Sequence, residues 1–214
     1  MKVLVACEES QTVAKEFREL NIQSYSCDIL EASGGYPEIH IKGDAIKEAY
    51  SGKYDLIIAH PPCTYMSKAG ARFMYPTAGN IDNNRLKLAL EAKGFFMALY
   101  NAPCKYVAVE NPTPLKCVGL PKHTQAVQPY QFGHPYSKRT LLWLKNLPKL
   151  ELTNVLTEWT PFLPSNTGGK KRGQSFSRGT AKNAAEASKT FKGIAEAMAK
   201  QWSEFIIKNE NKCD

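Results

Sequence analysis

A largely apolar run followed, after one histidine, by two prolines is the feature that most constrains how this sequence can fold. Residues 54–59 read Tyr-Asp-Leu-Ile-Ile-Ala, and His60-Pro61-Pro62-Cys63 follow directly. Such a run is typical of a parallel strand, because helices then cover both faces of the sheet. Proline lacks the amide hydrogen that a strand needs. The pattern therefore predicts a buried strand that ends in a rigid loop.

Similar runs and helical spacings alternate along the first half of the chain. We expect strands at residues 2–6, 23–27, 38–41 and 105–109, and helices at 12–20 and 83–100. This alternation predicts an α/β fold with a doubly wound, mostly parallel sheet, which is a Rossmann-like fold. Two later apolar runs, at residues 125–132 and 140–144, are expected to form an antiparallel hairpin at one edge of the sheet.

The length of the chain fits one domain. The 214 residues, of which 43% are hydrophobic, suit a single α/β domain over 1–214. Residues 164–182 are rich in glycine, serine, lysine and arginine, and predict a mobile basic loop. Residues 184–207 carry apolar side chains at helical spacing, and predict a C-terminal helix that packs back on the domain.

Charge and cysteine usage narrow the class of protein. The net charge of +8 favours polyanionic partners, of which nucleic acid is the commonest. None of the six cysteines forms a CxxC pair and the four histidines are scattered, so we expect no metal. The sequence holds no signal-peptide pattern and no apolar stretch of about 20 residues, so we expect a cytoplasmic protein without membrane contact and with reduced thiols.

The reactive side chains follow predicted strands. In a doubly wound sheet ligands bind beyond the carboxyl ends of the strands. Cys63 follows the double proline there and can act as a nucleophile if its thiolate is favoured. Glu110 ends a neighbouring strand, and we expect burial to raise its pKa so that it can donate to a ring nitrogen. Each residue also has a purely structural alternative: Cys63 could be a small buried side chain, and Glu110 could cap backbone amides.

Pro61-Pro62-Cys63 and, later, Val109-Glu110-Asn111-Pro112 resemble the PC and ENV signatures of cytosine-5 DNA methyltransferases. Residues 131–140 resemble the late GxPQxRxR segment of that family, and residues 188–202 lie where the family returns a helix to the cofactor pocket. The sequence is similar in particular to the small phage- and prophage-type members. The resemblance covers nearly the whole chain.

The resemblance implies S-adenosyl-L-methionine (AdoMet) as the cofactor and DNA as the partner. It implies that the Cys63 thiolate adds to carbon 6 of cytosine, that Glu110 stabilises the ring nitrogen and that carbon 5 takes the methyl group, as in restriction–modification. The expected cofactor-binding residues are Cys7, Glu8, Glu9, Ser10, Asp28, Ile29, Asp44, Ala45 and Pro61, with Asp28 at the ribose and Asp44 near the adenine. The expected substrate-binding residues are Pro62, Asn111, Lys138, Arg139, Thr140, Lys170, Lys171 and Arg172.

Two departures from the family pattern keep other functions open. The first loop, from Cys7 to Gln11, has no glycine, and only about forty residues occupy the place of a target-recognition domain, which is fewer than a usual domain. The alternatives are a methyltransferase for a free or short pyrimidine nucleotide and a non-catalytic protein that binds nucleotides or nucleic acid. An amino-methyltransferase is disfavoured, because it usually has an aromatic residue where Cys63 stands. The sequence specifies neither the target site, nor the strandedness of the DNA, nor the oligomeric state.

Overall fold

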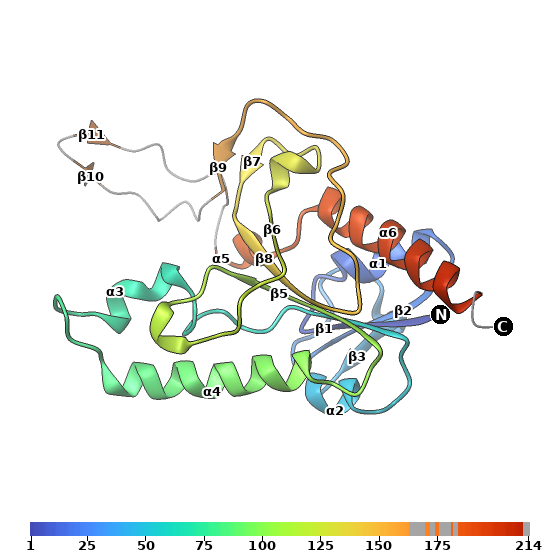
Figure 1. The fold of residues 1–214 in the computed structure, drawn as a ribbon, viewed down its shortest axis with the longest axis horizontal. Helices are drawn as coiled ribbons and strands as arrows, with labels where there is room; N and C mark the ends of the chain where they lie inside the picture. The colour runs from blue at the N-terminus through green and yellow to red at the C-terminus, as the bar shows by residue number, and fades with distance from the viewer. Residues whose placement is uncertain (163–169, 172–173, 176–180, 182–183, 212–214) are drawn as a thin grey trace.

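The computed structural model describes residues 1–162, 170–171, 174–175, 181 and 184–211. A seven-stranded sheet forms its centre, in the order β3-β2-β1-β4-β5-β8-β6 (Figure 1). The strands are β1 (Lys2–Ala6), β2 (Gln23–Asp28), β3 (His40–Lys42), β4 (Leu56–Ala59), β5 (Tyr106–Pro112), β6 (Gln125–Val127) and β8 (Thr140–Lys145).

Strands β1 to β5 are parallel, β8 is antiparallel to β5, and β6 is antiparallel to β8. The predicted fold class, a doubly wound and mostly parallel sheet with an antiparallel hairpin at one edge, is therefore confirmed.

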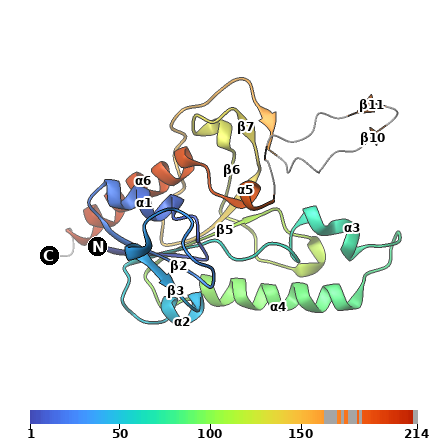
Figure 2. The ribbon, with the colours of Figure 1, turned by 180° about the vertical axis from the view of Figure 1, so that it is seen from behind.

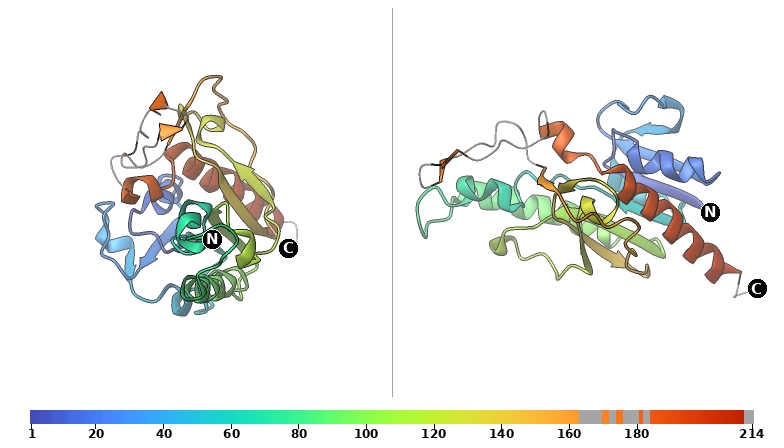
Figure 3. Two further views of the ribbon diagram at one scale, coloured as in Figure 1. Left: turned by 90° about the vertical axis from the view of Figure 1, so that its left-hand side faces the viewer. Right: turned by 90° about the horizontal axis from the view of Figure 1, so that it is seen from above.

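Helices cover both faces of the sheet (Figures 1 and 2). Val3 and Val5 of β1 face α1 (Thr12–Glu19) and α6 (Lys192–Glu210), whereas Leu4 and Ala6 face α2 (Ala45–Ala49) and α4 (Asn83–Tyr100). The left panel of Figure 3 shows α4 and α6 on opposite sides of the sheet. Because successive side chains of a strand point to opposite faces, an all-apolar strand requires this double covering.

Short elements connect the larger ones. The short helices are α3 (Ala71–Met74) and α5 (Ala184–Ser188), and the 3-10 turns are η1 (Pro37–Ile39), η2 (Lys68–Gly70), η3 (Lys116–Val118) and η4 (Pro129–Gln131). Strand β7 (Tyr136–Ser137) pairs in parallel with β9 (Thr160–Pro161), and β10 (Lys170–Lys171) pairs with β11 (Gln174–Ser175). Most of the loop predicted at 164–182 lies outside the described residues, Arg172 among them.

The bounds of several predicted elements change in the structure; the strand predicted at 38–41, for example, begins only at His40, after the 3-10 turn η1. The helix predicted at 184–207 is interrupted between Ser188 and Lys192, because Phe191 adopts an extended backbone and packs against an aromatic cluster. The strand predicted at 125–132 ends at Val127, because Pro129 begins the 3-10 turn η4.

The strand directions bring distant parts of the chain to one edge. The carboxyl ends of β1 to β5 meet there, and the sheet order changes direction between β1 and β4, which is where α/β sheets bind ligands. Because β8 runs the other way, its first residue, Thr140, pairs with Pro112 at the end of β5. Within the described part of the chain no helix is long and apolar enough to cross a membrane.

Candidate active site

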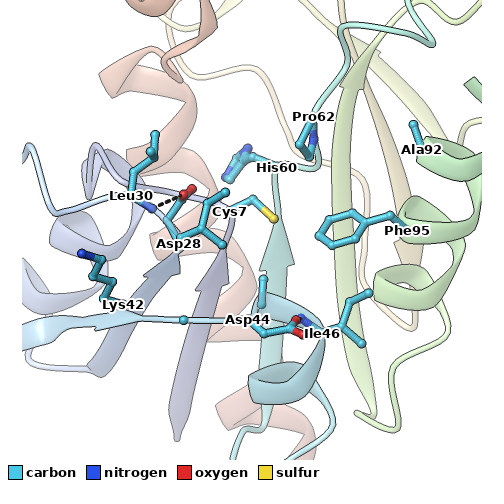
Figure 4. Close-up of a pocket in the computed structure, with 13 residues that line it drawn as sticks. Cys7, Asp28, Leu30, Lys42, Asp44, Ile46, His60, Pro62, Ala92 and Phe95 are labelled. Atoms are coloured by element: carbon cyan, nitrogen blue, oxygen red, sulfur yellow. Dashed lines mark hydrogen bonds between the residues drawn. The ribbon is translucent and has the colours of Figure 1, made fainter. Parts of the chain in front are cut away.

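A cavity of about 960 Å³ lies at the carboxyl ends of β1 to β4 and extends to α4 (Figure 4). Its size is within the range of small-molecule sites, which is about 300–1,000 Å³. Five of the predicted cofactor-binding residues line it, namely Cys7, Asp28, Ile29, Asp44 and Ala45. The structure therefore brings the ends of the first three strands together around one cavity.

Two carboxylates are held at this cavity by backbone amides. Asp28 Oδ1 accepts from the Leu30 amide at 2.9 Å. Asp44 caps α2, and its Oδ1 accepts from the Ile46 and Lys47 amides at 2.8 and 3.2 Å. The second oxygen of each carboxylate accepts no hydrogen bond from the described residues. Each aspartate is thus fixed in place with one oxygen that a ligand can use.

The wall opposite Asp28 comes from α4. Ala92 and Phe95 face the cavity, and neither was predicted as a site residue (Figure 4). Ala92 and Phe95 are three residues apart, so the sequence indicates that they share one face of the helix. The sequence does not indicate that this face lines a cavity, because the position of the cavity depends on how α4 crosses the sheet.

The other predicted cofactor residues lie outside the lining. Glu8 is buried, and its carboxylate accepts from the Val13 and Ala14 amides at 2.6 and 3.2 Å, which caps α1. Burial raises the pKa of Glu8 to about 7, although these hydrogen bonds and the charge of His60 oppose the shift.

Glu9 and Ser10 contact the connection between β2 and β3. The Glu9 carbonyl accepts from the Ser33 amide at 2.8 Å, and a Cβ on Gly34 would lie 2.4 Å from the Ser10 carbonyl oxygen. This close approach requires glycine at position 34. The two residues therefore fix the neighbouring loop and do not line the cavity.

Cys7 stands where the resembled family has a glycine-rich turn. Its φ of 59° is in the left-handed region, which disfavours most side chains. Burial, followed by the charges of Asp28, Cys27 and Asp44, raises the pKa of the Cys7 thiol to about 12. Cys7 is therefore a neutral, apolar part of the wall.

The loop after β4 is tied to both neighbouring strands. The His60 amide donates to the Ala6 carbonyl at 2.9 Å, and Asn111 Nδ2 donates to the Pro61 carbonyl at 2.9 Å. The Cys63 carbonyl accepts from the Met66 and Ser67 amides at 3.1 and 3.0 Å, which closes a turn. Pro62 lines the cavity, whereas Pro61 uses its carbonyl to join β5.

Cys63, Glu110 and Lys138 lie together next to this loop. Burial, and then the negative charge of Glu110, raise the pKa of the Cys63 thiol, while the Lys138 cation opposes the shift. Burial also lowers the pKa of Lys138, against the charges of Glu110 and Cys63. Because charge on Glu110 and on Lys138 shifts the pKa of Cys63, we call these three residues the electrostatic cluster.

The pKa of Glu110 shifts in the opposite direction to the one predicted from the sequence. The sequence predicted that burial would raise it, and this prediction was wrong. Burial does act in that direction, but the hydrogen bond from His60 and the charges of His60 and Lys138 outweigh it and lower the pKa. His60 Nδ1 lies 3.1 Å from Glu110 Oε2. Glu110 is therefore an ionised partner of His60, a pairing that strand patterns cannot indicate.

The remaining substrate-binding candidates divide into two groups. Thr140 is buried and lines a small pocket with Glu110, Lys138 and Phe191. Arg139 is exposed, and its charge, after burial, lowers the pKa of His123. Of Lys170 and Lys171 the structure describes the backbone only. The described residues hold no cluster of metal-ligating side chains.

No protein-family model matches the sequence, and no curated protein sequence matches it. Solved structures resemble its fold at low identity. They include a DNA modification methyltransferase encoded within an E. coli prophage, at 14% identity and a TM-score of 0.39, covering 74% of this chain and 51% of that one.

Two eukaryotic methyltransferases give similar values. The Entamoeba histolytica methyltransferase EhMeth has 17% identity and a TM-score of 0.44, covering 74% of this chain and 57% of that one. A variant of Spodoptera frugiperda DNMT2 has 15% identity and a TM-score of 0.39, covering 76% and 55%. The present chain thus spans about half the length of each of the three structures.

Proposed function

We propose that this protein transfers a methyl group from AdoMet to carbon 5 of cytosine in DNA, through a covalent adduct of Cys63. One observation carries the proposal: Glu110 and Lys138 line one small pocket and act electrostatically on Cys63, whose neighbour Pro62 lines the cavity that holds two carboxylates. A thiol, an acid–base group and a cation are the groups that addition to a pyrimidine ring requires.

The cavity fits AdoMet in size and in the chemistry of its lining. Asp28 and Asp44 each have an oxygen that is free to accept hydrogen bonds from ribose hydroxyls and an adenine amine. Ile29 and Phe95 supply apolar surface for a purine. AdoMet supplies an electrophilic methyl group when it is bound, and the roles of the protein's own residues follow from the cluster.

Cys63 is the nucleophile in this proposal. The ammonium of Lys138, which donates to the Lys189 carbonyl at 3.1 Å, favours the thiolate and would donate to the ring carbonyl as negative charge develops there. Glu110 meets the ring nitrogen, and Asn111 keeps the thiol loop against the strand that carries Glu110. Thr140 and Phe191 complete the small pocket next to Glu110 and Lys138.

The net charge of +8 supports a nucleic-acid substrate. Arg139, Lys170, Lys171 and Arg172 are the proposed phosphate contacts, which would add affinity without reading sequence. A pyrimidine nucleotide is the second candidate substrate. Only residues 146–183 separate β8 from α5, which is fewer than the about 50 residues of a small recognition domain.

The test is methyl transfer from labelled AdoMet to single-stranded DNA, duplex DNA and dCMP. We expect labelled DNA from the wild type and from the control Cys117→Ser, and none from Cys63→Ser. Wild-type rates in Cys63→Ser would overturn the covalent mechanism. Label in dCMP alone would favour the second candidate. No label, together with no AdoMet binding by calorimetry, would indicate a non-catalytic binding protein.

A further inference from the structure

His60 forms a buried pair with Glu110 at the edge of the sheet. The side chains are 11% and 13% exposed, and His60 Nδ1 lies 3.1 Å from Glu110 Oε2. His60 directly follows β4 and Glu110 lies within β5, and the two strands pair in register up to Ala59 and Val109. Their contact therefore follows from the register of these strands.

The other nitrogen of His60 has no partner. Nε2 is buried and makes no hydrogen bond with any described residue, while the His60 ring lines the cavity (Figure 4). Buried polar atoms of a folded protein are nearly always paired, so an unpaired one at a ligand site indicates a functional role.

A purely structural role does not explain this pair. The His60 amide already holds the loop to β1, and Asn111 already holds it to β5. A buried ion pair adds little stability, because removing both charges from water costs about as much as their attraction returns. The loop would keep its position without an ionisable side chain at residue 60.

The charges around His60 favour its protonated form. Glu110 faces it from β5 and Glu8 from the β1–α1 connection, while Lys138, from the segment before β8, opposes them. Burial by itself lowers the pKa of His60, but the hydrogen bond to Glu110 and the two carboxylates outweigh it and raise the pKa. The pair therefore favours a proton on the imidazole of His60 and a negative charge on Glu110.

We propose that His60 is a positioning residue that stores the proton which Glu110 delivers to the pyrimidine ring. This inference rests on the function proposed above. Such a role explains how Glu110, which is ionised in the free protein, can still protonate its substrate. The proton is bound to the neighbouring imidazole of His60 until the substrate needs it.

Each proton of the proposed reaction has a donor and an acceptor. The Cys63 thiol first loses its proton to solvent, and the thiolate forms the bond to carbon 6. The π electrons between carbons 5 and 6 form a new π bond between carbons 4 and 5. The π electrons between carbon 4 and nitrogen 3 become a lone pair on nitrogen 3. Nitrogen 3 takes a proton from Glu110, which takes the Nδ1 proton of His60. The carbon 4–carbon 5 π pair then forms the bond to the methyl group, whose bond to the sulfonium of AdoMet breaks and leaves a neutral thioether, while the nitrogen 3 lone pair re-forms the carbon 4–nitrogen 3 double bond. The carbon 5 proton leaves to solvent, and its electron pair re-forms the carbon 5–carbon 6 double bond as the sulfur–carbon bond breaks and releases the thiolate. Nitrogen 3 returns its proton to the pair of Glu110 and His60.

The first test compares the pH profile of methyl transfer in the wild type and in His60→Asn. The asparagine amide can replace Nδ1–H as a donor to Glu110, but it cannot store a proton. We expect the rate to fall by about tenfold or more, and the basic limb of the profile to move to lower pH. The control His123→Asn changes a histidine whose pKa is shifted by burial, Arg139 and Lys122 and not by Glu110, and it should leave rate and profile unchanged. An unchanged profile in His60→Asn would overturn the proposal.

The second test needs no activity. Imidazole ¹⁵N shifts of the free protein should show His60 titrating above its ordinary value of 6.5, and titrating lower in Glu110→Gln. A midpoint below 6.5 in the wild type, or no change in Glu110→Gln, would overturn the proton store. The methyltransferase proposal and the proton-store proposal can be told apart. If the wild type transfers no methyl group, both are overturned. If the wild type is active and His60→Asn is equally active, only the role of His60 is overturned.

Discussion

Asn111 Nδ2 donates a hydrogen bond to the carbonyl oxygen of Pro61 at 2.9 Å, and so joins the loop that carries Cys63 to the strand that carries Glu110. Asn111 is 1% exposed. Because Cys63 lies two residues after Pro61 and Glu110 directly precedes Asn111, this bond helps to fix the relative position of the thiol and the carboxylate.

Asn111→Ala should destabilise the protein. It leaves the Pro61 carbonyl without its partner in a buried position, which costs about 1–3 kcal/mol of unfolding free energy. Urea unfolding measures the difference. The matched variant Asn80→Ala, which removes an exposed bond to Thr77, should stay within about 0.5 kcal/mol of the wild type. Equal effects of the two variants would mean that the Asn111 bond does not stabilise the loop.

Asp28→Asn should weaken AdoMet binding. The amide oxygen still accepts from Leu30, so the loop keeps its shape, but the charged acceptor is lost. A hydrogen bond to a charged group contributes about 1.5–3 kcal/mol, so we expect a loss of roughly tenfold to a hundredfold in affinity by calorimetry. Asp55→Asn, at the amino end of β4, is the control. Unchanged affinity in Asp28→Asn would remove Asp28 from the cofactor site.

Two helical glycines should respond to alanine in opposite directions. A Cβ on Gly193 would lie 2.0 Å from the Phe132 carbonyl oxygen, so Gly193→Ala should cost about 1–3 kcal/mol through overpacking. A Cβ on Gly94, within α4, would meet no atom within 4 Å, so Gly94→Ala should stabilise by about 0.5–1 kcal/mol. Thermal unfolding of both variants tests the contact between α6 and the segment before β7.

The start of α6 should be sensitive to acid through His134. Its Nε2 accepts from the Gly193 amide at 2.9 Å, which requires a neutral ring, and burial lowers the pKa of His134. Because the pKa in the folded state lies below the value of 6.5 in the unfolded chain, the contribution is complete above pH 6.5 and is lost as the pH falls through the folded value.

The variant His134→Gln should therefore differ from the wild type more at about pH 7.5 than at about pH 5 in melting temperature. A difference that does not change with pH would show that the ring is not a neutral acceptor.

Elements of the fold could be predicted from the sequence where a short run of neighbouring residues determines them. The buried run before His60 and the apolar stretch before Glu110 predicted adjacent strands, and β4 and β5 do pair. The interruption at Phe191 could not be predicted, because the residues before it have helical propensity and the contacts with Tyr136 and Phe162 come from other parts of the chain.

The ionisation of Glu110 was not predictable for a similar reason. Its direction depends on His60, a residue of another strand, and on Lys138, which reaches the site only through the antiparallel β8. Burial of one side chain can be inferred from its own strand, whereas the charges that oppose burial come from the three-dimensional arrangement.

The position of β8 between β5 and β6 also has a consequence for the order of assembly. In the described sheet β6 pairs only with β8, through residues 140–142, so this edge cannot close until residue 142 is available, although β6 precedes β8 along the chain. Lys138 lies just before β8, so a shorter chain has the Cys63 thiol and the Glu110 carboxylate without this cation. The charge that opposes the rise in the pKa of Cys63 therefore comes from a later part of the chain than the thiol and the carboxylate.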